Sequence, residues 1–565
     1  MMRYAIFAAA FGLAACSPQG EPENGLTVEP PATLVLQGGP IHTANDETPM
    51  VDVVATRGDR IIYAGDVQGV QSYLGPDTRI IDLEGAALYP GFTDAHVHVL
   101  GVGQRETTHD LSSIESIADL QAWLYVAAEG VDPGGVVFGR GWIETHWPEG
   151  RFPNRQDLDA IAPNRQVILV RADGHALVAN SAALAAAGIT AESIAPEGGD
   201  ILHDDEGEPT GMLIDAAMGP IYGLRGEMSG EQRSDAYATG AAVMASYGWT
   251  GAHDMSVPWS DVPMIEALAD EGRLPIRTYI SVNPDGLAAL AAQTPRYGGN
   301  GRVITRAVKM YMDGALGSRG AALLAPYSDD AGNVGLVTSD EDETLSAMVT
   351  ALEAGVQLNI HAIGDRANRM LLDWIEDAQA ALPRDQWAMA DPRWRDEHTQ
   401  IVDPADIPRF AELGVIPSMQ PSHAIGDLFF APARLGSDRL DGAYAWRALI
   451  DSGVVIAGGS DAPVERGDPR IEFYAAVARR GVDGTQTEDW RPDQAVTRQE
   501  ALRMFTAWPA HASFREDELG QIAVGMRADF TVFSEDIMII PEADILSVEP
   551  VMTIVDGVVV WAAED

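Results

Sequence analysis

The second half of the chain alternates between amphipathic helical segments and short apolar runs. Apolar residues between 345 and 352 recur every three or four positions, the spacing of one helix face, and Gly355 separates them from the apolar run 356–361. The same helix–glycine–strand order recurs around Gly248, Gly414 and Gly453. Repeated units of this kind predict a parallel sheet covered by helices. Because many of these strands end in polar residues, we expect an α/β fold with a closed (β/α)8 barrel of the TIM type.

Both ends of the chain show a different pattern, of short β-rich runs separated by Gly, Asp and Pro. One group lies between residues 33 and 83, and the other follows residue 529. Asp556-Gly557, between two apolar runs, is typical of a β-hairpin. We therefore expect the two ends to build one small β-sandwich, with the barrel inserted between them. The predicted boundaries are 31–89 and 515–565 for the sandwich, and 90–104 and 231–514 for the barrel.

A long insertion, residues 105–230, follows the first predicted barrel strand. It has poor strand periodicity and many Pro, Gly and Trp residues. Long insertions next to an active strand commonly form a lid or a substrate domain. We therefore expect this region to cover the active site and to set its specificity.

The amino terminus has the features of an export signal. Residues 1–16 contain Arg3, an apolar run at 5–15 that is too short to span a membrane, and a Leu-Ala-Ala-Cys ending. That ending resembles the bacterial lipobox, and Cys16 is the only cysteine in the chain. We expect a lipoprotein on the periplasmic side of a bacterial membrane, anchored by a lipid on Cys16, with a flexible tether at 17–30. The alternative is an ordinary cleaved signal peptide.

Composition narrows the function without identifying it. Among 565 residues, 37 are Lys or Arg and 84 are Asp or Glu, which gives a formal net charge of −47. A surface this acidic repels phosphate backbones, so we expect no nucleic-acid partner. A single cysteine excludes a disulfide or a cysteine-based zinc site within one chain.

Residues that commonly bind metals stand at the ends of several predicted strands. His96 and His98 are two positions apart in the stretch 90–98, and side chains at i and i+2 of a strand share a face. The others are Lys309, His361, His398 and Asp461. Each alone has a plainer explanation, such as a helix cap or a buried core histidine. Together, four imidazoles and a carboxylate predict one site for zinc or a similar divalent ion.

Lys309 lies in an alternating run, so that Lys309, Tyr311 and Asp313 share one face. A lysine inside a barrel is costly to bury as a cation, and burial lowers its pKa. The neutral amine can react with carbon dioxide to give a carbamate, whose oxygens can bridge two metal ions. The alternative is an ion pair between Lys309 and Asp313 or another acid.

Several motifs follow one another in order along the chain. They are Pro-Gly-Phe-Thr-Asp-Ala-His-Val-His (90–98), Asp173-x-His175, Lys309 with Asp313-Gly314-Ala315-Leu316-Gly317-Ser318-Arg319, Asn359-Ile360-His361, Glu397-His398, Gly459-Ser460-Asp461-Ala462-Pro463 and Ala528-Asp529. As a set they resemble the amidohydrolase superfamily and, within it, the amidohydrolase-3 or YtcJ-like branch. The resemblance extends from about residue 32 to the end of the chain.

The resemblance implies a metal-dependent hydrolase with a distorted barrel beside the β-sandwich. The ligands that match by position, on the first, fourth, fifth, sixth and eighth strands, are His96, His98, Lys309, His361, His398 and Asp461. It also implies one or two Zn²⁺ ions, with Mn²⁺ or Co²⁺ as compatible substitutes, and a carboxylated Lys309.

The expected reaction is attack of a metal-activated hydroxide on a carbonyl. Asp461 would act as general base and then return the proton to the leaving nitrogen, with His361 also in a catalytic position. His175 or Tyr311 would stabilise the oxyanion.

The expected substrate contacts rest on weaker arguments. Arg319 could hold a substrate carboxylate, although a structural salt bridge explains it equally well. Asp313, Tyr311 and Trp142 are further substrate-binding candidates, and His423 and Trp147 are weaker candidates for the pocket wall.

The first hypothesis is therefore hydrolysis of a non-peptide C–N bond in an amide, N-formyl, N-acyl or cyclic amide compound. An ester, lactone or organophosphate hydrolase on the same metal site is the alternative among enzymes. If the protein is not an enzyme, the alternative is a non-catalytic substrate-binding lipoprotein. The expected partner is a small-molecule substrate, and a homodimer is compatible with the sequence.

Overall fold

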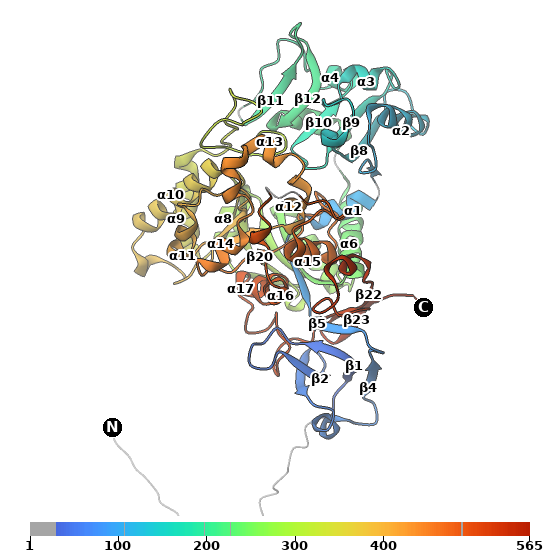
Figure 1. The fold of residues 1–565 in the computed structure, drawn as a ribbon, viewed down its shortest axis with the longest axis vertical. Helices are drawn as coiled ribbons and strands as arrows, with labels where there is room; N and C mark the ends of the chain where they lie inside the picture. The colour runs from blue at the N-terminus through green and yellow to red at the C-terminus, as the bar shows by residue number, and fades with distance from the viewer. Residues whose placement is uncertain (1–29, 107, 197, 227, 487–489, 565) are drawn as a thin grey trace, which may run out of the picture.

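The computed structural model describes residues 30–106, 108–196, 198–226, 228–486 and 490–564. The predicted signal peptide, its Cys16 and the tether up to residue 29 lie outside the described residues. Figure 1 shows the barrel in the middle of the molecule, with the inserted region at one end of the long axis and the sheet built from the chain ends at the other. Within the described residues, no helix is both long and apolar enough to cross a bilayer.

The barrel strands follow one another in chain order. In the described part of the chain they are β6 (Phe92–Val97), β13 (Trp249–Val257), β14 (Arg277–Val282), β16 (Val303–Tyr311), β17 (Gln357–Ala362), β18 (Arg395–His398), β19 (Ile416–Met419) and β20 (Ala457–Gly458), with the short antiparallel β15 (Arg296–Gly298) beside β16. Loop backbone joins the two ends of this sheet. Asp461 N donates to His96 O at 2.7 Å, and His98 N donates to Ala462 O at 2.8 Å. The predicted barrel is confirmed, and it is nearly closed.

Helices cover the barrel, and three of them end at glycines that the sequence pattern indicated. They are α1 (Val99–Glu106), α6 (Gly230–Tyr247), α7 (Val262–Asp270), α8 (Leu287–Ala291), α9 (Glu341–Ala354), α10 (Asp365–Ala381), α11 (Ile407–Leu413), α12 (Pro421–Asp427), α13 (Ala431–Leu435), α14 (Trp446–Asp451), α15 (Pro469–Ala478), α16 (Arg498–Met504) and α17 (Ala507–Ala512). Gly248, Gly355 and Gly414 end α6, α9 and α11 with φ of 106°, 74° and 70°. Because glycine adopts this left-handed conformation at little cost, it stops each helix and turns the chain into the next strand.

The two ends of the chain meet in one sheet. Its strands in the described residues run in the order β23 (Val558–Ala562), β22 (Pro550–Val555), β21 (Phe530–Phe533), β5 (Ala87–Pro90), β1 (Leu34–His42), β2 (Met50–Arg57) and β3 (Arg60–Gly65), with β4 (Arg79–Asp82) beside β1. β5 and β21 pair antiparallel and join the two halves. Asp556 and Gly557 both have positive φ between β22 and β23, as a tight hairpin requires.

The inserted region contains a sheet that the sequence pattern did not reveal. Its described strands run in the order β11 (Gly199–His203), β12 (Pro209–Asp215), β10 (Ala176–Ala179), β9 (Gln166–Arg171), β8 (Val136–Trp142) and β7 (His109–Asp110), with α2 (Ile117–Glu129), α3 (Arg155–Asp159), α4 (Ser181–Ala186) and α5 (Gly219–Tyr222). Val167 and Leu169 of β9 pack into one apolar cluster, and Ile168 and Val170 pack into another. Because both faces are covered, the alternation of polar and apolar residues that marks a half-exposed strand is absent.

Candidate metal centre and active site

The strand-end residues singled out from the sequence lie together at one end of the barrel. In strand order they are His96 on β6, His98 just after it, Lys309 on β16, His361 on β17, His398 at the end of β18 and Asp461 after β20. His96 Nε2 lies 3.3 Å from Lys309 Nζ. The ring centroid of His398 lies 4.6 Å from that of His96 and 4.5 Å from that of His361. Residues far apart in the chain converge because parallel strands bring their carboxyl ends to one face of the barrel.

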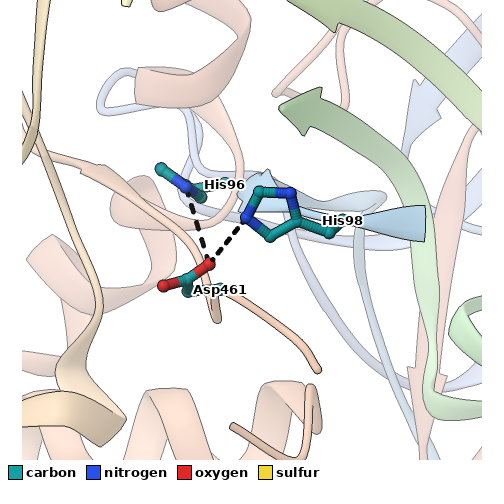
Figure 2. A group of neighbouring side chains, drawn as sticks. All are labelled: His96, His98 and Asp461. Atoms are coloured by element: carbon teal, nitrogen blue, oxygen red, sulfur yellow. Dashed lines mark ion pairs between the residues drawn. The ribbon is translucent and has the colours of Figure 1, made fainter. Parts of the chain in front are cut away.

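Asp461 lies at the centre of this group. Its Oδ1 is 3.6 Å from Nε2 of His96 and 3.2 Å from Nε2 of His98, and Figure 2 shows the carboxylate between these two imidazoles. Its Oδ2 is 4.0 Å from Nδ1 of His398 and 3.7 Å from Nε2 of His423. Within the described residues, two groups of metal-ligand type therefore share Asp461, one with His96 and His98 and one with His398 and His423.

Burial sets the charge of these ligands. It lowers the pKa of His96, His361 and His398 well below the ordinary value, so the rings are neutral and can offer a lone pair. Burial acts in the opposite direction on Asp461, but the nearby imidazoles outweigh it and hold the pKa of this carboxyl well below its usual range. The site therefore presents neutral nitrogens around one anionic carboxylate.

Hydrogen bonds behind the ligands determine which ring nitrogen faces Asp461. His96 Nδ1 donates to Glu397 Oε2 at 2.6 Å, and His98 Nδ1 donates to Met255 O at 3.1 Å. Both rings therefore turn Nε2 toward the carboxylate. Glu397 is itself held by Arg395, whose Nε lies 2.7 Å from Glu397 Oε1. Such partners orient a metal-binding imidazole and increase its basicity.

Two buried atoms of metal-ligand type at this point have no hydrogen-bond partner among the described residues. They are Asp461 Oδ1 and His361 Nε2. A buried polar atom without a partner is unfavourable by roughly 1–3 kcal/mol. A cation would satisfy them, together with Nε2 of His96 and His98. The residues present therefore fit a divalent ion with nitrogen and oxygen ligands.

His423 has a role that the sequence did not reveal. It lies in α12, three residues after Gln420, and Gln400 Nε2 donates to its Nδ1 at 3.0 Å. In a neutral ring the proton then lies on Nε2, which is buried and has no partner in the described part of the chain. His423 is therefore arranged to donate a hydrogen bond into the site rather than to bind a metal. Its place just after the seventh strand is the only sequence signal for this role.

The main chain is strained where two of these side chains emerge. His398 has φ of 81° and Asp461 has φ of 58°, in the left-handed region that non-glycine residues rarely adopt. Asp94 stabilises the second turn, because its carboxylate accepts from Ser460 N at 2.9 Å and from Ser460 Oγ at 2.5 Å. The end of β20 is thereby held against β6.

Lys309 is buried inside the barrel. Burial lowers its pKa to about 8, although the charges of Glu397 and Asp461 act in the other direction. No ion pair joins Lys309 to Asp313 in the described residues, and both oxygens of Asp313 accept backbone hydrogen bonds. The donors are the N–H groups of Ala322, Ile363 and Gly364, at 2.8–2.9 Å. Asp313 therefore orders the loops that follow β16 and β17.

His175 reaches the site from the inserted domain. Its Nδ1 lies 2.5 Å from Oδ1 of Asp215, the last residue of β12, and its ring centroid lies 5.6 Å from that of His361. Burial lowers the pKa of His175, but the hydrogen bond and charge of Asp215 prevail and raise it to about 9. His175 therefore faces the ligands as an imidazolium near neutral pH. Tyr311 lies on the same side, with its ring centroid 5.5 Å from that of His361.

Two of the predicted substrate contacts do not fit their positions. Trp142 is fully buried in the core of the inserted domain, where its Nε1 donates to Leu169 O at 2.9 Å. Arg319 pairs with Asp329, from Nη2 to Oδ2 at 3.0 Å, which is the structural salt bridge considered as its alternative. The side chain of Trp142 points into the core of the inserted domain, because that face of β8 packs there. The charge of Arg319 is neutralised by Asp329.

The metal-ligand group opens into a small cavity and then into a larger cleft. The inner cavity, of about 100 Å³, is lined by His175, His361, His398, His423 and Asp461 among others. The cleft, of about 910 Å³, lies between the barrel rim and the inserted domain. Residues of both domains line each space. The inserted region therefore forms one wall of the candidate active site.

A (β/α)8 barrel with buried histidines and a carboxylate at the carboxyl ends of its strands defines a metal-dependent hydrolase. Comparison with known proteins supports the same class. The amidohydrolase family model matches residues 79–561, and the chain belongs to that family. It is thus a metal-dependent amidohydrolase, an enzyme that hydrolyses carbon–nitrogen bonds.

The relatives span nearly the whole chain. The protein named amidohydrolase YtcJ from Bacillus subtilis is 32% identical over 543 residues, which are 93% of this chain and 99% of that protein. N-substituted formamide deformylase from Arthrobacter pascens is 30% identical over 546 residues, which are 93% and 97% of the two chains. A metal-dependent hydrolase of Pyrococcus horikoshii is similar in structure, with a TM-score of 0.73 and 26% identity over 90% of this chain and 99% of that one.

Proposed function

We propose that this enzyme hydrolyses an amide, N-formyl, N-acyl or cyclic amide bond of a small molecule, with zinc as its metal and Asp461 as general base and acid. The observation that carries the proposal is the Oδ1 of Asp461, which has no hydrogen-bond partner in the described residues and lies beside Nε2 of both His96 and His98. The relative named N-substituted formamide deformylase supports N-formyl and N-acyl amines as the first compounds to test.

His96, His98 and Asp461 would hold the ion, with His361 and His398 beside them. A bound divalent ion supplies Lewis acidity, which polarises a carbonyl and makes water more acidic. The protein's contribution is a dry, fixed set of neutral imidazoles and one carboxylate. The low pKa of Asp461 keeps that carboxylate ionised at neutral pH.

Proton transfer falls to Asp461. Its oxygens would accept a proton from the attacking water and deliver it to the nitrogen as the C–N bond breaks. The small inner cavity holds the reacting carbonyl close to this carboxylate and limits access of bulk water.

Two donors would stabilise the charge that develops on the carbonyl oxygen. His423 presents a buried Nε2–H that has no other partner among the described residues, and His175 presents a cationic ring held by Asp215. Preorganised donors of this kind are typically worth about 3–4 kcal/mol of transition-state stabilisation.

Lys309 would carry a carboxylate added after synthesis. Its lowered pKa leaves a fraction of the amine neutral near physiological pH. The Nζ lone pair would form a bond to the carbon of carbon dioxide and release one proton. The resulting carbamate would add anionic oxygen ligands to the site and permit a second ion.

We further propose that the enzyme acts on the periplasmic side of a bacterial membrane as a lipoprotein. The support is the run of residues 1–16 that ends in Leu-Ala-Ala-Cys. The lipid on Cys16 would be its only membrane contact, and its substrate would be a small molecule in that compartment.

The test uses the purified protein loaded with zinc, manganese or cobalt. N-formyl and N-acyl amines, cyclic amides, esters and lactones are assayed in parallel, and metal content is measured by mass spectrometry. We expect turnover of C–N substrates and a loss of at least about 1,000-fold in kcat for Asp461→Asn. Asp235→Asn, which removes an acid exposed on α6, is the matched control. Turnover of esters alone, or full activity in Asp461→Asn, would refute the proposal.

A further inference from the structure

The cleft between the barrel rim and the inserted domain adjoins the inner cavity. The two spaces share the lining residues Ile143, Ala172, Gly426, Val464 and Glu465. A substrate whose reacting bond lies beside Asp461 has the cleft as its neighbouring space. The chemistry of the cleft then determines which group the substrate carries at its other end.

Guanidinium groups gather on the walls of this cleft. They are Arg105, Arg140, Arg225 and Arg466. Because the whole chain has 84 acidic and only 37 basic residues, four arginines in one cleft run against its overall charge. Three acids also line the cleft. Glu106 is engaged by Arg105 at 3.4 Å, burial raises the pKa of Glu465 to about 8, and Asp110, beside Arg140 in the sheet, accepts from Ser112 N at 2.8 Å.

Arg140 is the best placed of these four arginines. It lies on β8, and its Nη2 donates to Ala172 O at 3.3 Å. A Cβ on Gly174 would meet the same nitrogen at 3.0 Å, so the guanidinium lies against the turn that leads to His175. The cationic end of Arg140 is therefore close to a residue that faces the metal ligands.

Arg140 also lacks the acidic partners that Arg171 has on the next strand. Its Nε is shielded from solvent and has no hydrogen-bond partner among the described residues. No carboxylate of the described chain forms an ion pair with the half-buried Arg140, although Arg171 contacts both Glu144 and Asp173. An anionic ligand would supply the missing partner through charge-assisted hydrogen bonds.

Arg225 supplies a second charge on the same wall. Its guanidinium carbon lies 3.5 Å from the centre of the Phe138 ring, and Phe138 is also on β8. This stacking fixes the plane of the guanidinium and leaves its edge N–H groups available to a ligand. No described carboxylate forms an ion pair with Arg225 either.

We propose that the cleft binds a carboxylate at the far end of the substrate, with Arg140 as its hydrogen-bonding partner and Arg225 as a supporting charge. The substrate is then an N-acyl or N-formyl amine that carries a carboxylate on the amine side. The identity of the reacting bond rests on the function proposed above. The carboxylate-binding role considered for Arg319 thereby passes to Arg140.

A homologous series of substrates tests the inference. The ω-acetamido acids from N-acetylglycine to 6-acetamidohexanoate are compared with N-alkylacetamides of equal length and no charge. We expect the zinc-loaded enzyme to prefer the carboxylate member at one length by at least about tenfold in kcat/KM, because charge-assisted hydrogen bonds discriminate by about that factor or more. The preferred length reports the span from Asp461 to Arg140.

Variants of Arg140 test whether this residue causes the preference for carboxylate substrates. Arg140→Gln is expected to lower kcat/KM for the preferred acid by about 10- to 100-fold through KM, with no loss on the matched neutral amide. Arg140→Lys keeps the charge and is expected to retain part of the preference. It tests the role of Arg140 even where the glutamine variant misfolds. Arg151→Gln is the matched control, because Arg151 pairs with Asp157 on the surface of the same domain.

A binding measurement separates failure of this inference from failure of the proposed function. Calorimetric titration of the acids into Asp461→Asn protein needs neither turnover nor bound zinc. Binding that weakens at least tenfold in the Asp461→Asn/Arg140→Gln double variant supports the inference. Equal affinity with and without Arg140 at every length, or equal kcat/KM for acids and neutral amides, overturns it. Absence of C–N hydrolysis beside Arg140-dependent binding refutes only the proposed function.

Discussion

Asp215 is the residue through which the inserted domain controls the charge of the active site. Its Oδ1 lies 2.5 Å from Nδ1 of His175, and this contact raises the pKa of His175 to about 9 against the effect of burial. Replacement by asparagine keeps the size of the side chain and removes the charge. We therefore expect Asp215→Asn to return the pKa of His175 to about 6.5 or below.

The size of the effect follows from the two pKa values. At pH 8, about nine tenths of His175 is protonated with a pKa of about 9, but only about 3% is protonated with a pKa of about 6.5. If the imidazolium stabilises the oxyanion, kcat/KM at pH 8 falls about 30-fold in the variant. At pH 6 most His175 is protonated in both proteins, so the difference shrinks to about twofold or less.

The raised pKa of His175 also contributes to the stability of the folded protein. A pKa raised in the folded state contributes stability that is fully present below about pH 6.5 and is lost as pH rises through about 9. The upper bound for this contribution is about 3 kcal/mol, from the difference between the two pKa values. Wild-type protein should therefore exceed Asp215→Asn in thermal stability at pH 6, and the gap should narrow toward pH 10.

The assay is a profile of kcat/KM from pH 6 to pH 10 for both proteins on one substrate, with Asp235→Asn as the control. Nitrogen NMR of labelled histidine reports the pKa of His175 directly. A variant that matches the wild type at pH 8 while NMR shows the lowered pKa would refute the role of the imidazolium. An unchanged pKa would refute the structural argument itself.

Three further predictions concern other parts of the account. Glu397→Gln replaces the anionic acceptor that orients His96 with a weaker neutral one and should weaken zinc binding about 10- to 100-fold, measured by competition with a chelator; unchanged affinity would contradict the role given to this charged hydrogen bond. Protein incubated with ¹³C-bicarbonate should show a carbamate resonance that Lys309→Met lacks, and its absence from the metal-loaded wild type would exclude the carboxylated lysine. Cys16→Ala should move the protein from the membrane fraction to the soluble fraction of bacterial cells, and an unchanged distribution would contradict the lipid anchor.

The sequence predicted the barrel well because its signals are local. A helix face, a glycine and an apolar strand follow one another within about twenty residues, and Gly248, Gly355 and Gly414 take the helix-ending conformation that this order requires. The sheet of the inserted domain escaped notice because β9 and its neighbours are covered on both faces. Strands of that kind have no alternation to recognise.

The candidate site likewise contains residues that the sequence could predict and residues that it could not. Ligands at strand ends could be predicted because a parallel barrel brings those ends together, and His96, His361 and Asp461 lie where that rule puts them. The pairing of Arg319 with Asp329 and the inward direction of Trp142 depend on loop and sheet geometry. Contacts of that kind form between segments whose relative placement no local pattern encodes.

The role of Arg140 depends on absence of a partner, which only the folded chain reveals. In sequence it stands between two glycines and near several acids. In the fold, Glu144 and Asp173 contact Arg171 instead, and Arg140 is left at the wall of the cleft. A charge without a counterion in the described chain is therefore found by accounting for contacts, not by motif.

The central claim is that the imidazoles of His96 and His98 share one ion with Asp461. Diffraction from crystals grown with zinc, measured on both sides of the zinc absorption edge, tests it most directly. The account predicts an anomalous peak within coordinating distance of Asp461 Oδ1 and Nε2 of both histidines, absent from crystals of Asp461→Asn or much weaker in them. A protein that takes up zinc elsewhere, with no peak among these three side chains, would contradict it.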